Sequence, residues 1–205
     1  MAARQATLQR FGSDAYAVAM AGHRELLRFS AVALVRGGRL LFEALELAVE
    51  PGEALHVAGP NGSGKSSLIR LAAGLLQASA GTVTRSRLAL ADDALALDRE
   101  QALRTALSFW GGAVAPAMEA LGVAHLSDVP VRLLSSGQQK RATLARVAAS
   151  KAPLWLLDEP LNALDAEGGE RLAALIQRHR KGGGAVVAAS HLPLPGEWQV
   201  LELGR

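Results

Sequence analysis

The apolar positions fall into short runs of strand length near the start of the chain and into helically spaced runs farther along. Residues 26–35 and 40–49 are apolar runs separated by a glycine-rich turn at 36–39. Two such runs joined by a short turn predict a β-hairpin. A second turn, at 51–53, leads into a short apolar strand at 54–58 that runs directly into a glycine-rich loop.

From residue 66 onward, apolar residues recur at helical spacing in several segments, and short apolar runs lie between those segments. Helices are expected at 66–76, 101–110, 115–121, 137–150 and 167–180, and strands at 88–91, 154–157, 185–189 and 200–203, with a further strand or turn beginning at 81. Strands that alternate with helices predict a parallel sheet covered on both faces. The expected fold class is therefore α/β.

Composition narrows the classes of protein that this pattern allows. With 205 residues, 50% of them hydrophobic, the chain is long enough to bury a sizeable core. It contains no cysteine, which excludes disulfides, thiolate metal sites and thiol nucleophiles. The net charge of +3 is spread along the chain, so we expect no nucleic acid partner. No apolar run approaches the length of a transmembrane helix.

Residues 1–23 are polar and small without a sustained period, and we expect them to form a flexible N-terminal tail. Met1 and Met20 are both candidate start residues. The apolar run at 15–21 is shorter than the core of a secretory signal, so no cleaved signal is expected.

The glycine-rich loop at 59–66 carries the first candidate chemistry. Its sequence, GPNGSGKS, fits the pattern G-x-x-x-x-G-K-[ST] in full and lies between a predicted strand and a predicted helix. Its glycines let backbone N–H groups converge on phosphate oxygens, and the helix adds the positive end of its dipole. Lys65 is expected to reach the outer phosphates, and the Ser66 hydroxyl to ligate Mg²⁺. The expected nucleotide-binding residues here are Gly59, Pro60, Asn61, Gly62, Ser63, Gly64, Lys65, Ser66 and Ser67.

The apolar strand at 154–157 ends in two carboxylates, Asp158 and Glu159. Ligands of open α/β sheets bind at the carboxyl ends of the strands, so both acids are expected beside the glycine-rich loop. Asp158 is expected to hold Mg²⁺, and Glu159 to orient or deprotonate the attacking water. The loop and the two acids together predict hydrolysis of a nucleoside triphosphate.

The segment Leu134-Ser135-Ser136-Gly137-Gln138 resembles the signature motif of ABC-type ATPases, and it begins 20 residues ahead of the acidic strand. Pro160 follows the two acids, residues 161–165 resemble the D-loop of that family, and Ser190-His191 resembles its switch histidine. The resemblance covers about the last 180 residues. It implies a P-loop NTPase of ABC type over 24–205, with a mostly parallel sheet core, an N-terminal antiparallel β subdomain and a small helical subdomain at about 94–136.

In this family, the signature of a second subunit closes over the nucleotide that the first subunit holds, which gives a head-to-tail dimer with two ATP molecules. The resemblance therefore implies that Ser135, Ser136, Gly137 and Gln138 contact ATP bound to a partner copy. His191 is expected to contact the γ-phosphate and the attacking water, and the implied catalytic residues are Lys65, Glu159 and His191. ATP binding would favour the closed dimer, and hydrolysis would remove that contact.

Two positions depart from the family pattern. A glutamine is expected at the end of the strand at 88–91, and the chain has Asp93 there, which can reach Mg²⁺ through water but cannot donate as an amide does. An aromatic residue that stacks on adenine is expected about 23 residues before the loop, and this position holds Arg36. A guanidinium plane can stack on a base, and a solvated charge in a turn is the alternative interpretation of Arg36.

Trp155, the run at 129–141 and residues 191–194 together resemble the ATP-binding subunit of the cytochrome c maturation transporter, the heme exporter ATPase. This resemblance implies an integral membrane permease as partner and a peripheral position on the cytoplasmic side of the inner membrane. It also implies that ATP hydrolysis is coupled to heme export or to release of a heme-loaded chaperone. Phe109 and Trp110 are candidates for the coupling face or, alternatively, for the core of the helical subdomain.

Two alternative functions stay open. One is the ATPase subunit of another ABC exporter or importer. The other is a soluble ABC ATPase outside transport, although the segment between Asp93 and Leu134 is too short for the long coiled coil of DNA-repair members. Copurification with a membrane subunit would separate these classes.

Overall fold

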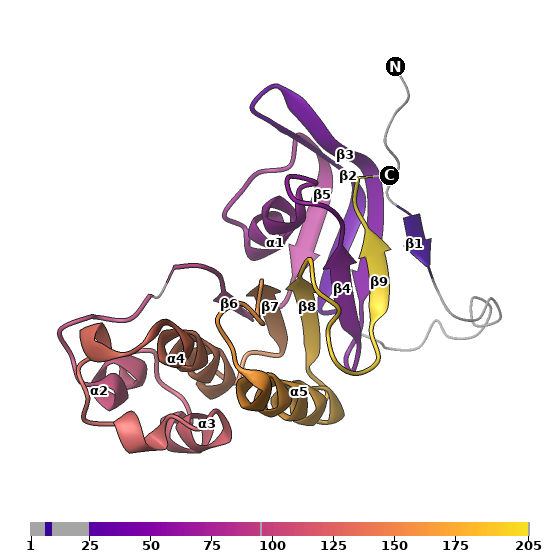
Figure 1. The fold of residues 1–205 in the computed structure, drawn as a ribbon. Helices are drawn as coiled ribbons and strands as arrows, with labels where there is room; N and C mark the ends of the chain where they lie inside the picture. Colours follow the sequence, from indigo (N-terminus) through magenta and orange to yellow (C-terminus); the bar gives the residue numbers. More distant parts are fainter. Residues whose placement is uncertain (1–6, 10–24, 95, 205) are drawn as a thin grey trace.

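The computed structural model describes residues 7–9, 25–94 and 96–204. Its main sheet has the strand order β1-β9-β4-β8-β7-β6 (Figure 1). The neighbours from β9 to β6 are parallel, and β1 lies antiparallel to β9 at the edge. The strands are β1 Thr7–Gln9, β4 Ala54–Ala58, β6 Leu88–Ala91, β7 Leu154–Asp158, β8 Ala185–Ala189 and β9 Gln199–Glu202. The predicted parallel sheet is therefore confirmed.

A second, antiparallel sheet is formed by β2 Leu27–Arg36, β3 Arg39–Val49 and β5 Ala80–Arg85, in the order β3-β2-β5. Arg36 pairs with Arg39 across a two-residue turn, Gly37-Gly38, in which both glycines have positive φ. Such a turn suits the twist of a hairpin and is easily adopted by glycine. The hairpin predicted from the sequence is thus confirmed, and its tip carries two arginines.

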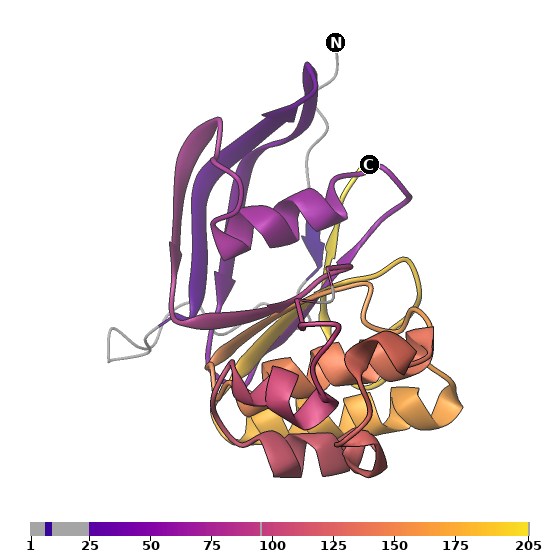
Figure 2. The same ribbon diagram turned by 90° about the vertical axis from the view of Figure 1, so that its left-hand side faces the viewer.

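Helix α1, Lys65–Ala73, lies between the antiparallel sheet and one face of the main sheet (Figure 2). The opposite face is covered by α4 Ser136–Ala149 and α5 Ala166–Lys181, with α2 Leu103–Ser108 and α3 Val114–Ala120 beyond them. Two short 3₁₀ turns, η1 Ala124–Leu126 and η2 Val131–Leu133, connect α3 to α4. The elements between 103 and 133 occupy the segment where the helical subdomain was expected.

Strand β7, which lies between β8 and the edge strand β6, separates two hydrophobic cores. Leu154 and Leu156 are buried with α1 and the antiparallel sheet, whereas Trp155 and Leu157 are buried with the helices of the other face. Alternate side chains of a strand point to opposite faces, so a strand covered on both sides is apolar throughout. This burial fixes the position at which Asp158 and Glu159 leave the sheet.

Some element bounds differ from the sequence expectation. Helix α1 ends at Ala73 and not at 76, because Gly74 adopts the left-handed conformation and closes the last turn through its N–H. Helix α2 is shorter at both ends than the expected 101–110. Most of the expected tail at 1–23 lies outside the described residues, and β1 is the part of it that is described.

Candidate active site

The glycine-rich loop connects β4 to α1 at the carboxyl edge of the main sheet. Gly59 has a φ of 142°, and a Cβ at this position would lie 2.4 Å from the carbonyl oxygen of Leu203, so a larger residue would clash with the backbone. Gly64 precedes the helix in a left-handed conformation, and no side chain among the described residues caps α1. The first N–H groups of a helix have no partner within it, so this end can bind an anion.

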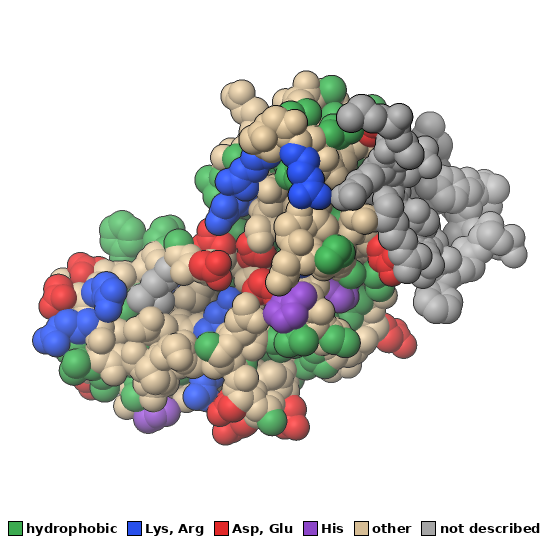
Figure 3. Space-filling model, turned by 45° about the horizontal axis from the view of Figure 1, so that its top comes forward, with side chains coloured by type: hydrophobic (Ala, Val, Ile, Leu, Met, Phe, Trp, Pro, Cys, Tyr) green, Lys and Arg blue, Asp and Glu red, His purple; other side chains and the backbone are tan. Residues whose placement is uncertain are grey.

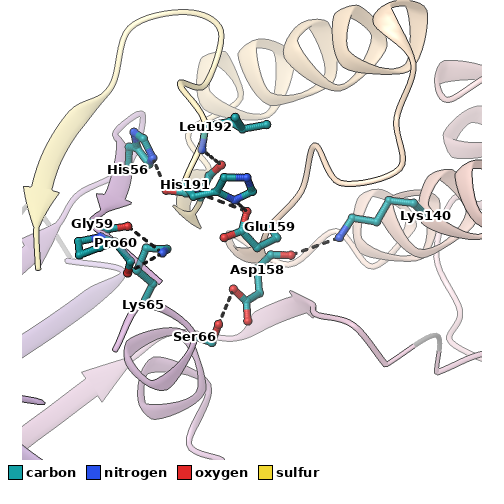
Figure 4. Close-up of polar contacts among 11 residues, drawn as sticks. His56, Gly59, Pro60, Lys65, Ser66, Lys140, Asp158, Glu159, His191 and Leu192 are labelled. Carbon is teal, nitrogen blue, oxygen red and sulfur yellow. Dashed lines mark hydrogen bonds and ion pairs between the residues drawn. The ribbon is translucent and has the colours of Figure 1, made fainter. Parts of the chain in front are cut away.

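Lys65 is buried, with 6% of its surface exposed, and its Nζ donates to the carbonyl oxygens of Gly59 at 2.8 Å and Pro60 at 3.2 Å (Figure 4). The ammonium group of Lys65 is thus held against the start of the loop at 59–66. Ser63 Oγ is also buried and has no hydrogen-bond partner among the described residues. A positive charge and an unpaired hydroxyl in one loop fit an oxyanion such as a phosphate group.

Ser66 and Asp158 join the loop to β7. Ser66 Oγ donates to Asp158 Oδ1 at 3.0 Å, and Asp158 has 3% of its surface exposed. Burial raises the pKa of Asp158 above its ordinary value; the bond from Ser66 opposes this shift, and the charges of Asp93 and Glu159 add to it. A hydroxyl and a carboxylate are hard oxygen donors, so the pair fits Mg²⁺, whose charge would favour the ionised carboxylate.

Glu159 follows β7 with a φ of 44°, which is uncommon for a residue with a side chain. Its Oε2 lies 2.9 Å from His191 Nδ1, and its backbone N–H donates to the carbonyl oxygen of Ala189 in β8. His56 Nε2 lies 3.1 Å from the carbonyl oxygen of Ser190, next to His191. The structure therefore brings together the acid and the histidine that the sequence assigned to the attacking water.

A cleft of about 470 Å³ opens above the loop. Figure 3 shows basic side chains above it and acidic side chains below it. Arg36 lines the cleft, and its Nη1 donates to Ser67 Oγ at 3.1 Å. None of the described residues that line it is aromatic. The lining residues are Arg36, Arg39, Leu41, Asn61, Gly62, Gly64, Lys65, Ser66, Ser67 and Glu159.

The signature segment does not line this cleft. Ser135 precedes α4, its Oγ accepts from the N–H of Gln138 at 3.3 Å, and Gln138 Oε1 accepts from the N–H of Ser135 at 2.9 Å. These two bonds form a capping box. Within one chain, none of Ser135, Ser136, Gly137 and Gln138 lines the cleft above the loop at 59–66.

Asp93 is exposed beyond the end of β6 and does not line the cleft either. Its charge nevertheless acts on Lys140 and Asp158. It follows the carboxyl end of β6, the strand that pairs with β7, so it lies at the same edge of the sheet as the two acids of β7.

The sequence analysis assigned no role to Lys140, Arg39, Leu41 or His56. Lys140 Nζ donates to the carbonyl oxygen of Asp158 at 3.2 Å, and the other three lie at the cleft or behind His191. A sequence signal existed for Lys140, because it is two residues beyond the signature segment, but spacing does not show where its side chain goes.

Comparison with known proteins agrees with this geometry. A family model described as ABC transporter matches residues 42–162. A cytochrome c biogenesis ATP-binding export protein CcmA from Sphingopyxis alaskensis is 55% identical to the chain, over 82% of the chain and 91% of the relative. The protein of the same description from Novosphingobium aromaticivorans is 58% identical, over 80% and 87%.

Solved structures show the same fold at lower identity. The structure titled as an ATP binding subunit of an ABC transporter has a TM-score of 0.75 and 19% identity, covering 82% of this chain and 80% of its own. An inward-facing putative metal-chelate type ABC transporter gives a TM-score of 0.71 and 22% identity, covering 87% and 79%. The predicted P-loop fold of ABC type, with its parallel sheet, antiparallel sheet and helices, is confirmed.

Proposed function

Since the chain belongs to the ABC transporter family, and within it to the cytochrome c biogenesis ATP-binding export proteins, we propose that it drives an export complex for c-type cytochrome assembly. In this proposal it hydrolyses ATP and couples the reaction to heme export or to release of a heme-loaded chaperone. The observation that carries the proposal is the meeting of Lys65, the Ser66–Asp158 pair and the Glu159–His191 pair at one sheet edge.

The hydrolytic step follows from the positions of these groups. Lys65 and the loop amides bind the β- and γ-phosphates and draw negative charge away from the bond that breaks. Glu159 orients the attacking water and accepts its proton, and His191, 2.9 Å from that carboxylate, fixes its orientation. The γ-phosphate is released as inorganic phosphate and ADP remains.

Ser66, at the start of α1, and Asp158, at the end of β7, would hold Mg²⁺. Bound there, Mg²⁺ would supply positive charge that offsets the charge of the phosphates. Asp93 would act on the metal through a bound water.

A second copy of the chain would complete each ATP site. The separation of the signature segment from the cleft within one chain supports this arrangement, because residues 135–138 would then face the nucleotide of a partner copy. A head-to-tail homodimer has two such sites, and ATP favours its closed form because both copies contact each nucleotide.

An integral membrane permease is the proposed partner, with the chain bound peripherally at the cytoplasmic side of the inner membrane. Within the part of the chain that the structure describes, no helix is long and apolar enough to cross a membrane. Phe109 is 83% exposed on the helical side of the molecule and packs edge-to-face with Trp110. Exposed aromatic side chains are typical of binding surfaces, so this pair is the proposed docking point.

The test is copurification from bacterial membranes with ATP turnover measured in the same preparation. We expect the chain to be retained by a cytochrome c maturation membrane subunit and Phe109→Asp to be lost from the membranes. Leu75→Asp, which changes a leucine that is exposed beside α1, serves as the control and should be retained. Glu159→Gln should bind ATP, accumulate a dimer and lose turnover by about 100-fold or more.

The outcomes separate the alternatives. Retention by a different permease would indicate another ABC exporter or importer. A chain that stays out of the membrane fraction and whose turnover rises with added nucleic acid would contradict the transport function. Unchanged turnover in Glu159→Gln would contradict the role of that carboxylate.

A further inference from the structure

We infer that Lys140 is a positioning residue of the hydrolytic site, which holds the peptide between Asp158 and Glu159 and offsets the negative charge of Asp93. The inference rests on the proposed ATP hydrolysis, and it adds a residue that neither the loop nor the signature segment contains. It is carried by the contacts at the carboxyl ends of β6 and β7.

Register places two pairs of acids side by side. Strands β6 and β7 are parallel neighbours, and Ala91 lies opposite Leu157. Asp92 and Asp93 follow the end of β6, and Asp158 and Glu159 stand at the end of β7, so both pairs leave the sheet at the same edge. Neighbouring negative charges repel one another. Because Asp158 is buried, less water screens the repulsion between its carboxylate and the other acids.

Lys140 comes to this edge from the second turn of α4. It is half-buried, and its Nζ donates to the carbonyl oxygen of Asp158 at 3.2 Å (Figure 4). The N–H of the same peptide group belongs to Glu159 and donates to Ala189 at 2.8 Å. The peptide that joins the proposed metal ligand to the proposed base is thus held from both sides.

This peptide needs such support because Glu159 has a positive φ. A non-glycine residue in that region is strained, and it persists when its surroundings hold it there. If the carbonyl oxygen of Asp158 lost the bond from Lys140, the peptide could rotate, and both the Asp158 and the Glu159 carboxylates would move. A displacement of about 1 Å in a catalytic group can cost about 100-fold in rate.

The positive charge of Lys140 is the second part of its proposed role. Burial lowers the pKa of Lys140, and Asp93 leads the surrounding carboxylates that oppose the shift, ahead of Asp158, Glu159 and Asp92. The charges of all four acids therefore act on this side chain. Its positive charge compensates for an acid that stands where an uncharged glutamine is expected from the family resemblance.

Helix α4 also forms a hydrogen bond to β6, the strand next to β7. Arg146 donates from Nη2 to the carbonyl oxygen of Leu90 in β6 at 2.7 Å, and its guanidinium lies 4.7 Å from the centre of the Trp110 ring. Lys140 and Arg146 thus attach one helix to the ends of β6 and β7. A movement of α4 would therefore shift the peptide that joins Asp158 to Glu159.

The experiment is a double-mutant cycle of Lys140→Met and Asp93→Asn, with kcat and KM for ATP measured at saturating Mg²⁺ and Tm measured without nucleotide. We expect Lys140→Met to lower kcat by about 10-fold or more with KM within about 2-fold. Lys140→Arg should keep most of the activity. Adding Asp93→Asn to Lys140→Met should recover part of kcat and of Tm, because one opposing charge is gone.

Lys181→Met is the matched control, because Lys181 is exposed at the end of α5, where the chain approaches the amino end of β8 at the opposite edge of the sheet. It should leave kcat unchanged. Strictly additive effects of the two substitutions on both kcat and Tm would overturn the inference, and so would full activity in Lys140→Met. An inactive wild-type protein would instead contradict the proposed function, and the Tm cycle would still decide whether Lys140 and Asp93 are coupled.

Discussion

The two helices whose N-termini were expected to meet phosphate begin in different ways. Helix α1 follows Gly64, which has left-handed backbone angles, and no described side chain caps it. Helix α4 follows Ser135, whose side chain forms a complete capping box with Gln138. Both ends carry the partial positive charge of a helix dipole, but only one of them has its first-turn donors occupied by the chain itself.

This difference indicates how the two ends are used. The amides at α1 have no competing side chain, so a phosphate group can take them without breaking a bond. At α4 the N–H of Gln138 is already satisfied, which stabilises the helix in a single subunit. An ATP molecule from a partner copy would use the remaining amides of Ser136 and Gly137 or displace the Ser135 cap. On the proposed function, the α1 end binds the nucleotide tightly and the α4 end makes a contact that forms and breaks with the dimer.

Lys65→Ala should give the largest effect, because it removes the charge at the open end of α1. We expect phosphate release to fall by about 100- to 1000-fold, as is typical when a charged or donating group is removed from a developing charge. Steady-state phosphate release and nucleotide binding by fluorescence would measure this. Lys181→Met serves again as the control, and turnover of Lys65→Ala within about 3-fold of wild type would contradict the assigned role.

Ser135 allows the cap and the proposed nucleotide contact of α4 to be separated. Ser135→Ala removes the cap and should cost about 1 kcal/mol of stability, or about 2–4 °C in Tm for a domain of this size. Ser135→Asp keeps a capping oxygen but brings a negative charge toward the phosphate of a partner copy. We therefore expect Ser135→Asp to keep Tm and to lose ATP turnover.

The result that would break the comparison is equal behaviour of the two variants. If Ser135→Asp turned over ATP as fast as the wild type, the α4 end would have only a structural role. If Ser135→Ala and Ser135→Asp lowered Tm by the same amount, the capping oxygen at position 135 would not be what stabilises the start of α4.

Much of the fold could be predicted because the signals were local. The loop at 59–66 is defined by glycine spacing that constrains the backbone directly, and the apolar run of β7 follows from burial on both faces. The end of α1 was placed too late because Leu75 continued the apolar pattern, although Gly74 had already closed the helix. Leu75 is in fact exposed.

The contacts that complete the site could not be predicted in the same way, because they depend on how separate elements pack. Lys140 meets the carbonyl oxygen of Asp158 only because α4 lies against the ends of β6 and β7. The positive φ of Glu159 likewise has no signal in its residue type, and it occurs where the N–H of Glu159 bonds to Ala189 in a separate strand. Counting along the sequence placed Arg36 near a nucleotide, but it did not show that its guanidinium binds Ser67.

Substitution of Arg36 is expected to have the smallest effect. It tests whether the residue at position 36 contacts the base of a nucleotide whose phosphates are bound at the α1 end. Because its guanidinium is held by Ser67 in the first turn of α1, it contributes positive charge to the cleft, and no described lining residue offers an aromatic ring. Arg36→Tyr should add base stacking worth about 1 kcal/mol, which lowers KM for ATP by about 5-fold. Arg36→Gln removes the charge without adding a ring and should raise KM slightly.

Inorganic tripolyphosphate has no base, so it should inhibit Arg36→Tyr no better than Arg36→Gln. Stronger inhibition of the tyrosine variant by tripolyphosphate would mean that position 36 acts on the phosphates and not on the base.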